Sequence, residues 1–160
     1  MTRGYRNNNP LNIRIDKKNP WLGRVIPNTD GEFEQFTSMA YGYRAAMKLL
    51  RNYIKMGYKT VSDLINRWAP PTENNTSSYV SNVCKETGFS PSKLINADDG
   101  DSIKKLVYAM SISENGRSIM PDKEAIKEGW QMLGIPEYGK KLLIVPAIII
   151  GGLLAHFFTN

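Results

Sequence analysis

The chain has few of the residues that build metal centres or disulfides. Its 160 residues include one cysteine, Cys84, and one histidine, His156. A single cysteine cannot form an internal disulfide, and one Cys with one His cannot complete a zinc centre. We therefore predict no metal and no other cofactor. The first fourteen residues are polar and basic and contain no apolar run, so no secretory signal peptide is predicted.

The charge is unbalanced toward the basic side. The formal net charge is +6 and the pI is about 9.4, which favours an anionic partner. Nucleic acid, anionic lipid and bacterial cell wall all fit that description. The basic residues are scattered, apart from the pairs Lys104-Lys105 and Lys140-Lys141. No specific nucleic-acid partner is therefore predicted.

The spacing of apolar residues predicts a mainly α fold. The length suits one domain with its own core. Helices are expected over residues 38–57, 60–69, 76–88, 91–95, 101–116 and 121–133. The first fourteen residues, with three Asn before Pro10, are expected to be turn-rich and non-helical. Val25-Ile26 and residues 32–36 flank a turn and predict a small β-hairpin. The expected fold is thus α+β, a compact helical domain with this hairpin near the N-terminus.

The helix over residues 101–116 carries the most informative side chain. Its inward stripe is followed, at the same spacing, by Glu114, and Asn115-Gly116 is a stop signal. Burial and the negative end of a helix both raise the pKa of a carboxyl, as a general acid requires. The alternative is a glutamate at the surface of a frayed helix end. The stripe comprises Ile103, Leu106, Val107 and Met110.

Two polar segments offer further candidates. Glu73 comes just before a predicted helix N-terminus at Thr76, where the dipole favours the ionised form, so it is the second candidate for catalysis. Asn amides such as those of residues 7–9 both donate and accept hydrogen bonds, which suits sugar hydroxyls and N-acetyl groups. The alternative for them is a structural cluster of Asx-turns.

The last part of the chain differs in composition. Lys140-Lys141 precede Leu142–Phe158, an apolar run of roughly 17 residues that predicts a single transmembrane helix. The alternatives are a buried core helix and a self-association segment. The expected domains are therefore residues 1–138, the helical domain, and 139–160, a membrane anchor with its positive flank on the cytoplasmic side at synthesis.

An ordered set of motifs spans residues 3 to about 120. The segments are RGYRNNNPLNIR (3–14), WLG (21–23), Phe33 and Phe36, GYRA (42–45), RWAPPTENNT (67–76) with Tyr79, and SENG (113–116). In this set the chain resembles bacteriophage lytic proteins that are similar to lytic transglycosylases of the lysozyme superfamily. The motif order looks circularly permuted, with the Asn-rich loop before the catalytic helix. Leu11 departs from the glycine common in that family.

This resemblance implies a lysozyme-like fold and cleavage of the β-1,4 bond between N-acetylmuramic acid and N-acetylglucosamine in peptidoglycan. It implies Glu114 as the acid, with Glu73 as runner-up. A second carboxylate, Glu73 or Asp30, would instead permit hydrolysis. Substrate contacts are expected from Asn8, Asn9, Asn12, Arg14, Trp21, Asn74, Asn75 and Tyr79.

The resemblance and the tail together predict a location and a use. The protein would be membrane-associated, in a virion's internal membrane or the host inner membrane, with other virion proteins as further partners. It would open the cell wall as the phage enters the cell. The alternatives are a late lysis muramidase and a non-enzymatic virion membrane protein that retains a lytic fold.

Overall fold

The fold is mainly helical. The computed structural model describes residues 1–72 and 75–135. Within that part, the extended pairings outside helices are isolated β-bridges: Arg14 with Phe33, Arg24 with Phe36, and Thr60 with Leu94. The helices are α1 (Arg3–Arg6), α2 (Met39–Lys55), α3 (Val61–Trp68), α4 (Thr76–Thr87), α5 (Gly100–Asn115) and α6 (Lys123–Gln131).

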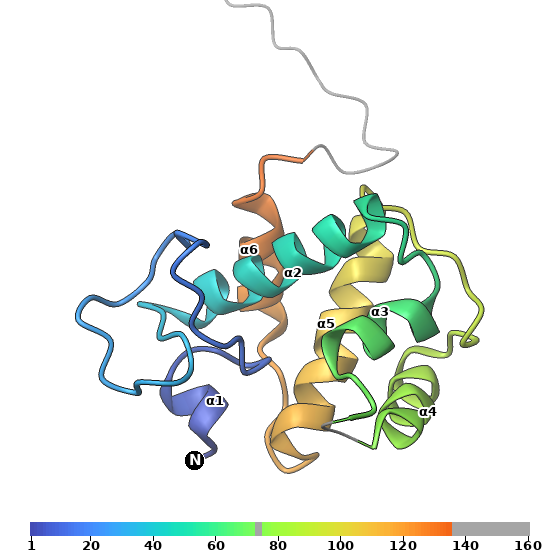
Figure 1. The fold of residues 1–160 in the computed structure, drawn as a ribbon, viewed down its shortest axis with the longest axis horizontal. Helices are drawn as coiled ribbons and strands as arrows, with labels where there is room; N and C mark the ends of the chain where they lie inside the picture. Colours follow the sequence, from blue (N-terminus) through green and yellow to red (C-terminus); the bar gives the residue numbers. More distant parts are fainter. Residues whose placement is uncertain (73–74, 136–160) are drawn as a thin grey trace, which may run out of the picture.

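Helix α5 lies at the centre, and α2, α4 and α6 pack against it (Figure 1). It begins after Asp99, whose side chain accepts a hydrogen bond from the Ser102 backbone N–H at 3.0 Å. Its predicted stripe is confirmed, because Ile103, Leu106, Val107 and Met110 are all fully buried. The stripe fixes the rotation of α5, and therefore the direction in which Glu114 points.

Glycines bring two helices close to their neighbours. A Cβ on Gly129 of α6 would lie 2.7 Å from the carbonyl oxygen of Ala40 in α2, so the two backbones are in direct contact. A Cβ on Gly100 would lie 2.6 Å from the ring of Trp130, which is itself buried. These contacts hold α2, α5 and α6 together behind the groove described below.

Side-chain caps set the starts of α3 and α4. Thr60 and Asp63 form a reciprocal capping box at α3. Helix α4 is capped by Asn75, which accepts from the Ser78 backbone N–H at 3.2 Å, and not by Thr76 as expected. The Thr76 hydroxyl instead donates to the Ala69 carbonyl at 2.6 Å, because Thr76 is buried against the end of α3.

The N-terminal region differs from the prediction in two ways. Residues 3–6 form the short helix α1, although this segment was expected to be non-helical. The expected hairpin is reduced, within the described residues, to one isolated antiparallel bridge between its arms, Arg24 with Phe36. The physical reason is competition for partners, since Glu34 N donates to Ile13 O at 2.9 Å while Val25 N donates to Gln35 O at 2.8 Å. Residues 32–36 therefore lie between two segments.

The short helix expected over residues 91–95 is also wrong. The segment is a turn followed by a bridge, in which Val61 N donates to Lys93 O at 3.1 Å and Ile95 N donates to Lys59 O at 2.8 Å. Pairing with the start of α3 satisfies these backbone groups, whereas an isolated turn of helix would leave most of them without partners.

The predicted transmembrane helix needs correction. None of the helices formed by residues 1–72 and 75–135 is both long enough and apolar enough to cross a membrane. The run Leu142–Phe158, on which the prediction rested, lies outside the described residues, as does the whole expected anchor 139–160. This finding contradicts the fold class with a membrane helix and the single-pass localisation, and neither is carried further.

Candidate active site

Glu114 is held in the last turn of α5, on the face that carries the buried stripe. It follows Met110 by four residues and Val107 by seven, and its side chain is half-buried. Asn115 ends the helix, and Gly116 follows with a positive φ of 84°. The alternative of a glutamate at a frayed, fully exposed helix end is therefore not what the structure shows.

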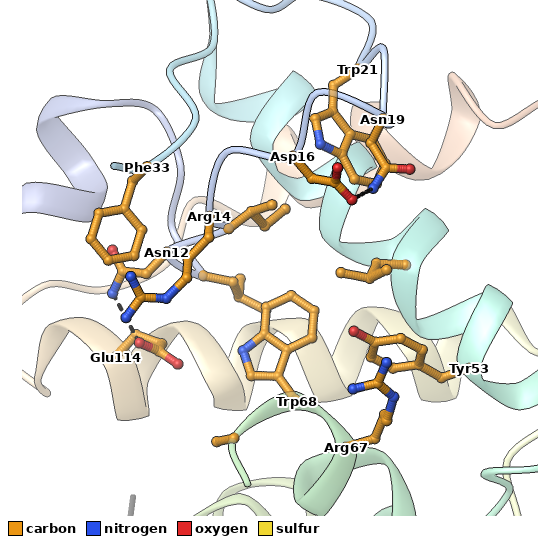
Figure 2. Close-up of a pocket in the computed structure, with 14 residues that line it drawn as sticks. Asn12, Arg14, Asp16, Asn19, Trp21, Phe33, Tyr53, Arg67, Trp68 and Glu114 are labelled. Atoms are coloured by element: carbon orange, nitrogen blue, oxygen red, sulfur yellow. Dashed lines mark hydrogen bonds between the residues drawn. The ribbon is translucent and has the colours of Figure 1, made fainter. Parts of the chain in front are cut away.

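Both carboxylate oxygens of Glu114 accept hydrogen bonds from distant parts of the chain. The Tyr79 hydroxyl, on α4, donates to Oε1 at 2.9 Å. The Asn12 amide, in the N-terminal loop, donates to Oε2 at 2.9 Å, a contact that Figure 2 shows. The indole of Trp68 contributes a further hydrogen bond. The side chain thus has one well-defined orientation.

The surroundings of Glu114 raise its pKa. Burial is the largest cause, and the hydrogen bonds from Asn12, Tyr79 and Trp68 act in the opposite direction because they favour the ionised form. Burial and the nearby carboxylate also raise the pKa of Tyr79 well above its usual value, so that its phenol remains a donor at neutral pH. A carboxyl that keeps its proton more readily than usual, beside fixed donors, is suited to general acid catalysis.

Glu114 forms part of the wall of a groove with a volume of about 780 Å³. Figure 2 shows the indole of Trp68 between Glu114 on one side and Tyr53 with Arg67 on the other. The lining mixes flat rings with amides and charges, the composition that sugar-binding grooves use. The other lining residues are Leu11, Asn12, Ile13, Arg14, Asp16, Asn19, Trp21, Phe33, Leu49 and Ala69.

The three predicted asparagines of the N-terminal loop have different tasks. Asn9 is fully buried, and its amide donates to Ile13 O and Glu34 O, both at 2.9 Å. The Asn8 amide donates to Phe36 O at 3.0 Å. Asn12 alone of the three lines the groove. The Asn9 side chain is thus enclosed, and substrate contact by these residues stays a prediction. The amides of Asn8 and Asn9 reach the carbonyls of Phe36 and Glu34, which is a structural role but not the expected Asx-turns.

Left-handed backbone places the Asn12 side chain. Asn8 and Asn12 have φ of 50° and 51°, a region that Asn tolerates better than other non-glycine residues. Asn115, next to Glu114, connects the loop to α5: its amide donates to Pro10 O at 2.7 Å, and its oxygen accepts from Thr2 Oγ1 at 2.6 Å. Sequence reasoning missed Asn115, although a polar residue beside a stop signal on an inward face was a usable signal.

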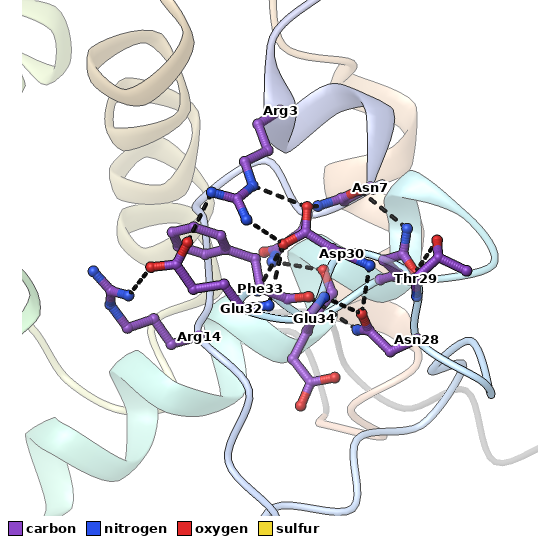
Figure 3. A network of polar contacts seen from close by, with 12 residues as sticks. Arg3, Asn7, Arg14, Asn28, Thr29, Asp30, Glu32, Phe33 and Glu34 are labelled. Carbon is purple, nitrogen blue, oxygen red and sulfur yellow. Dashed lines mark hydrogen bonds and ion pairs between the residues drawn. The ribbon is translucent and has the colours of Figure 1, made fainter.

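A charged network supports the other side of the loop (Figure 3). Arg3 donates to Asp30 Oδ1 at 2.6 Å and to Glu32 Oε2 at 2.9 Å, and Arg14 donates to Glu32 Oε1 at 2.6 Å. Both guanidinium groups stack on Phe33, at 4.4 and 5.1 Å from its centroid. Arg14, a predicted substrate contact, thus lines the groove with its charge already opposed by Glu32.

Some of the remaining predicted residues line the groove or contact Glu114, and others do neither. Trp21 lines the groove but is only 8% exposed, and its indole nitrogen has no hydrogen-bond partner within residues 1–72 and 75–135. Tyr79 contacts Glu114, as described. Asn75 caps α4. Glu73 and Asn74 lie outside the described residues. Asp30, a candidate second carboxylate, does not line the groove, and its side chain is 4% exposed in the Arg3 network.

The described residues form a small helical protein with a half-buried glutamate on the wall of a polar, aromatic-lined groove. Comparison with known proteins then gives its family. The chain is 36% identical over 132 residues to Protein P5 of Pseudoalteromonas phage PM2, a match that covers 81% of this chain and 80% of P5. The chain belongs to the family of this phage protein. No model of a known protein family matches it.

Proposed function

We propose that this protein is a bacteriophage peptidoglycan-cleaving enzyme in which Glu114 is the general acid. The observation that carries the proposal is a half-buried carboxyl of raised pKa, on the wall of a groove of about 780 Å³, with hydrogen bonds from Tyr79 and Asn12 to its two oxygens. The phage relative supports the bacteriophage origin, and the choice of substrate rests on the resemblance to lytic transglycosylases.

In the proposed reaction, Glu114 donates its proton to the glycosidic oxygen between N-acetylmuramic acid and N-acetylglucosamine. The bond from the muramic anomeric carbon to that oxygen breaks, and the Glu114 carboxylate then takes a proton from the muramic 6-hydroxyl. That oxygen attacks the anomeric carbon and forms a 1,6-anhydro ring. No water is consumed, and Tyr79 and Asn12 stabilise the carboxylate between the two proton transfers.

The positions of the acids in residues 1–72 and 75–135 favour single-carboxylate chemistry over hydrolysis. Hydrolysis by the two-carboxylate route needs a second carboxyl across the cleft. Among the described residues, Asp16 is the other acid that lines the groove, and it is already engaged by the Asn19 amide at 2.8 Å and the Lys18 backbone N–H at 2.9 Å. Asp30 faces the Arg3 network instead.

Glu114→Gln tests the proposal. Gln keeps the size of the side chain but cannot donate a proton to an ether oxygen as an acid does, so clearing of peptidoglycan in a zymogram should fall by at least about 100-fold. The melting temperature should remain within a few degrees. Glu128→Gln, on the exposed face of α6, is the matched control and should clear normally.

Two outcomes decide between the alternatives. Normal clearing by the Glu114→Gln variant would remove Glu114 as the acid. Mass spectrometry of the fragments released by the unmodified protein distinguishes the reactions, since 1,6-anhydro ends indicate a transglycosylase and reducing ends a muramidase. If the purified full-length protein releases no fragments, the enzymatic proposal fails and a structural role in the phage remains.

A further inference from the structure

The groove contains a cation that has no acidic partner among the described residues. Arg67 lies in the last turn of α3 and lines the same groove as Glu114. Neither ion pair nor hydrogen bond joins its guanidinium to a group in residues 1–72 or 75–135, and its side chain is exposed. The other lining cation, Arg14, is bound to Glu32 at 2.6 Å.

Aromatic rings hold Arg67 in place instead. Its guanidinium carbon lies 4.9 Å from the centroid of Tyr53 and 5.9 Å from that of Tyr58, and these two rings pack edge to face with centroids 6.3 Å apart. These cation–π contacts restrict the long side chain but do not use its N–H groups as hydrogen-bond donors. Its N–H groups, which lie in the plane, remain available to bind an acceptor with two oxygens.

Arg67 also has a fixed relation to the acid. It precedes Trp68, and the Trp68 indole reaches Glu114. Figure 2 shows Glu114 and Arg67 on opposite sides of this indole, both toward the groove. A glycan strand that places a glycosidic bond at Glu114 therefore presents an adjacent portion of the same strand to Arg67.

We propose that Arg67 is a specificity-determining residue that binds a carboxylate carried by the glycan strand, so that the groove selects acid-bearing glycans over uncharged ones. This inference rests on the proposed function for the identity of the strand. Two sources of the carboxylate have the same chemistry: the lactyl group of a sugar that carries no stem peptide, and the acids of an attached stem peptide. Bidentate pairing with either would position the strand along the groove.

The test measures binding and cleavage separately, with the full-length protein. Binding is measured by co-sedimentation of Glu114→Gln and of the double variant Glu114→Gln/Arg67→Gln with three forms of peptidoglycan. The first is intact, and its lactyl carboxyls are joined to stem peptides as amides. The second has lost its stem peptides to an amidase, which frees the lactyl carboxylates, and the third is the second with those carboxylates converted to amides. Cleavage of all three is measured with the protein that retains Glu114.

The expected result is that Arg67→Gln weakens binding to the charged forms by about three- to tenfold, as for a partly screened ion pair, and leaves binding to the amidated form unchanged. Arg67→Lys should recover part of the loss, since it keeps the charge without the planar fork. Arg67 dependence on the intact form, in which the stem peptide blocks the lactyl carboxyl, assigns the carboxylate to the peptide, and Arg67 dependence on the peptide-free form assigns it to the lactyl group.

Lys127→Gln makes the same change of charge at an exposed position of α6, outside the groove, and serves as the control. The inference would be overturned if Glu114→Gln and Glu114→Gln/Arg67→Gln bound each of the two charged forms equally well. This holds even if the unmodified enzyme cleaves both forms. Arg67-dependent binding without any cleavage by the unmodified protein would sustain the inference about the site and refute the proposed enzymatic activity.

Discussion

Tyr79→Phe probes the hydrogen bond that most directly controls the proton of Glu114. The substitution removes one oxygen and keeps the ring that packs beside the core. The lost contact is the phenol that donates to Glu114 Oε1 at 2.9 Å. A hydrogen bond to a charged group contributes about 1.5–3 kcal/mol, and the lower end applies because the Glu114 side chain is only half-buried.

The sign of the effect follows from which form the phenol stabilises. Its hydrogen bond favours the ionised carboxylate, so its removal raises the pKa of Glu114 further. Activity requires the protonated acid and falls as pH rises through this pKa, and about 1.36 kcal/mol corresponds to one pH unit. The alkaline limb of the pH–rate profile should therefore move upward by about one unit.

The maximal rate should fall at the same time. The carboxylate that forms when Glu114 gives up its proton has lost one of its donors, so a cost of about 1.5 kcal/mol reduces the rate by roughly tenfold. The assay is the initial rate of muropeptide release from about pH 4 to 9, which spans the acid and alkaline limbs. Tyr108→Phe, which alters a phenol of α5 outside this groove, is the control and should leave the profile unchanged. An unmoved alkaline limb in the Tyr79→Phe variant would refute the reasoning.

Two further substitutions test how the loop is held. Asn12→Gly and Asn12→Ala both remove the donor to Glu114, so each should lower activity by about tenfold. Only Ala strains the backbone at φ 51°, so only the melting curve of the Ala variant should show a loss of stability, of about 1 kcal/mol. Full activity of the Asn12→Gly variant would exclude a role for this amide. Gly42→Ala places a Cβ against the Asn8 carbonyl and 2.8 Å from Pro10 Cδ, and should cost about 1–3 kcal/mol in urea unfolding. An unchanged unfolding midpoint would show that the loop does not pack on α2 as described.

Local sequence patterns predicted the long helices well because the features that define a helix come from residues close together in the chain. The 3.6-residue period of α5 and its stop at Asn115-Gly116 depend only on neighbours along the chain. The same holds for the capping box of Thr60 and Asp63. Where distant backbone groups compete, local patterns failed, as for the hairpin at residues 25–36 and the helix at 91–95.

The candidate site shows the same division. The period of α5 placed Glu114 on the inward face, so the sequence by itself determined that this helix carries a carboxyl toward the interior. Only the tertiary structure brought it to Asn12, 102 residues away, and to Tyr79, 35 residues away. It also buried Asn9 while leaving Asn12 on the groove, although both belong to one motif. The physical reason is that helix rotation follows from nearest-neighbour spacing, whereas hydrogen-bond partners and exposure depend on which distant segments pack together.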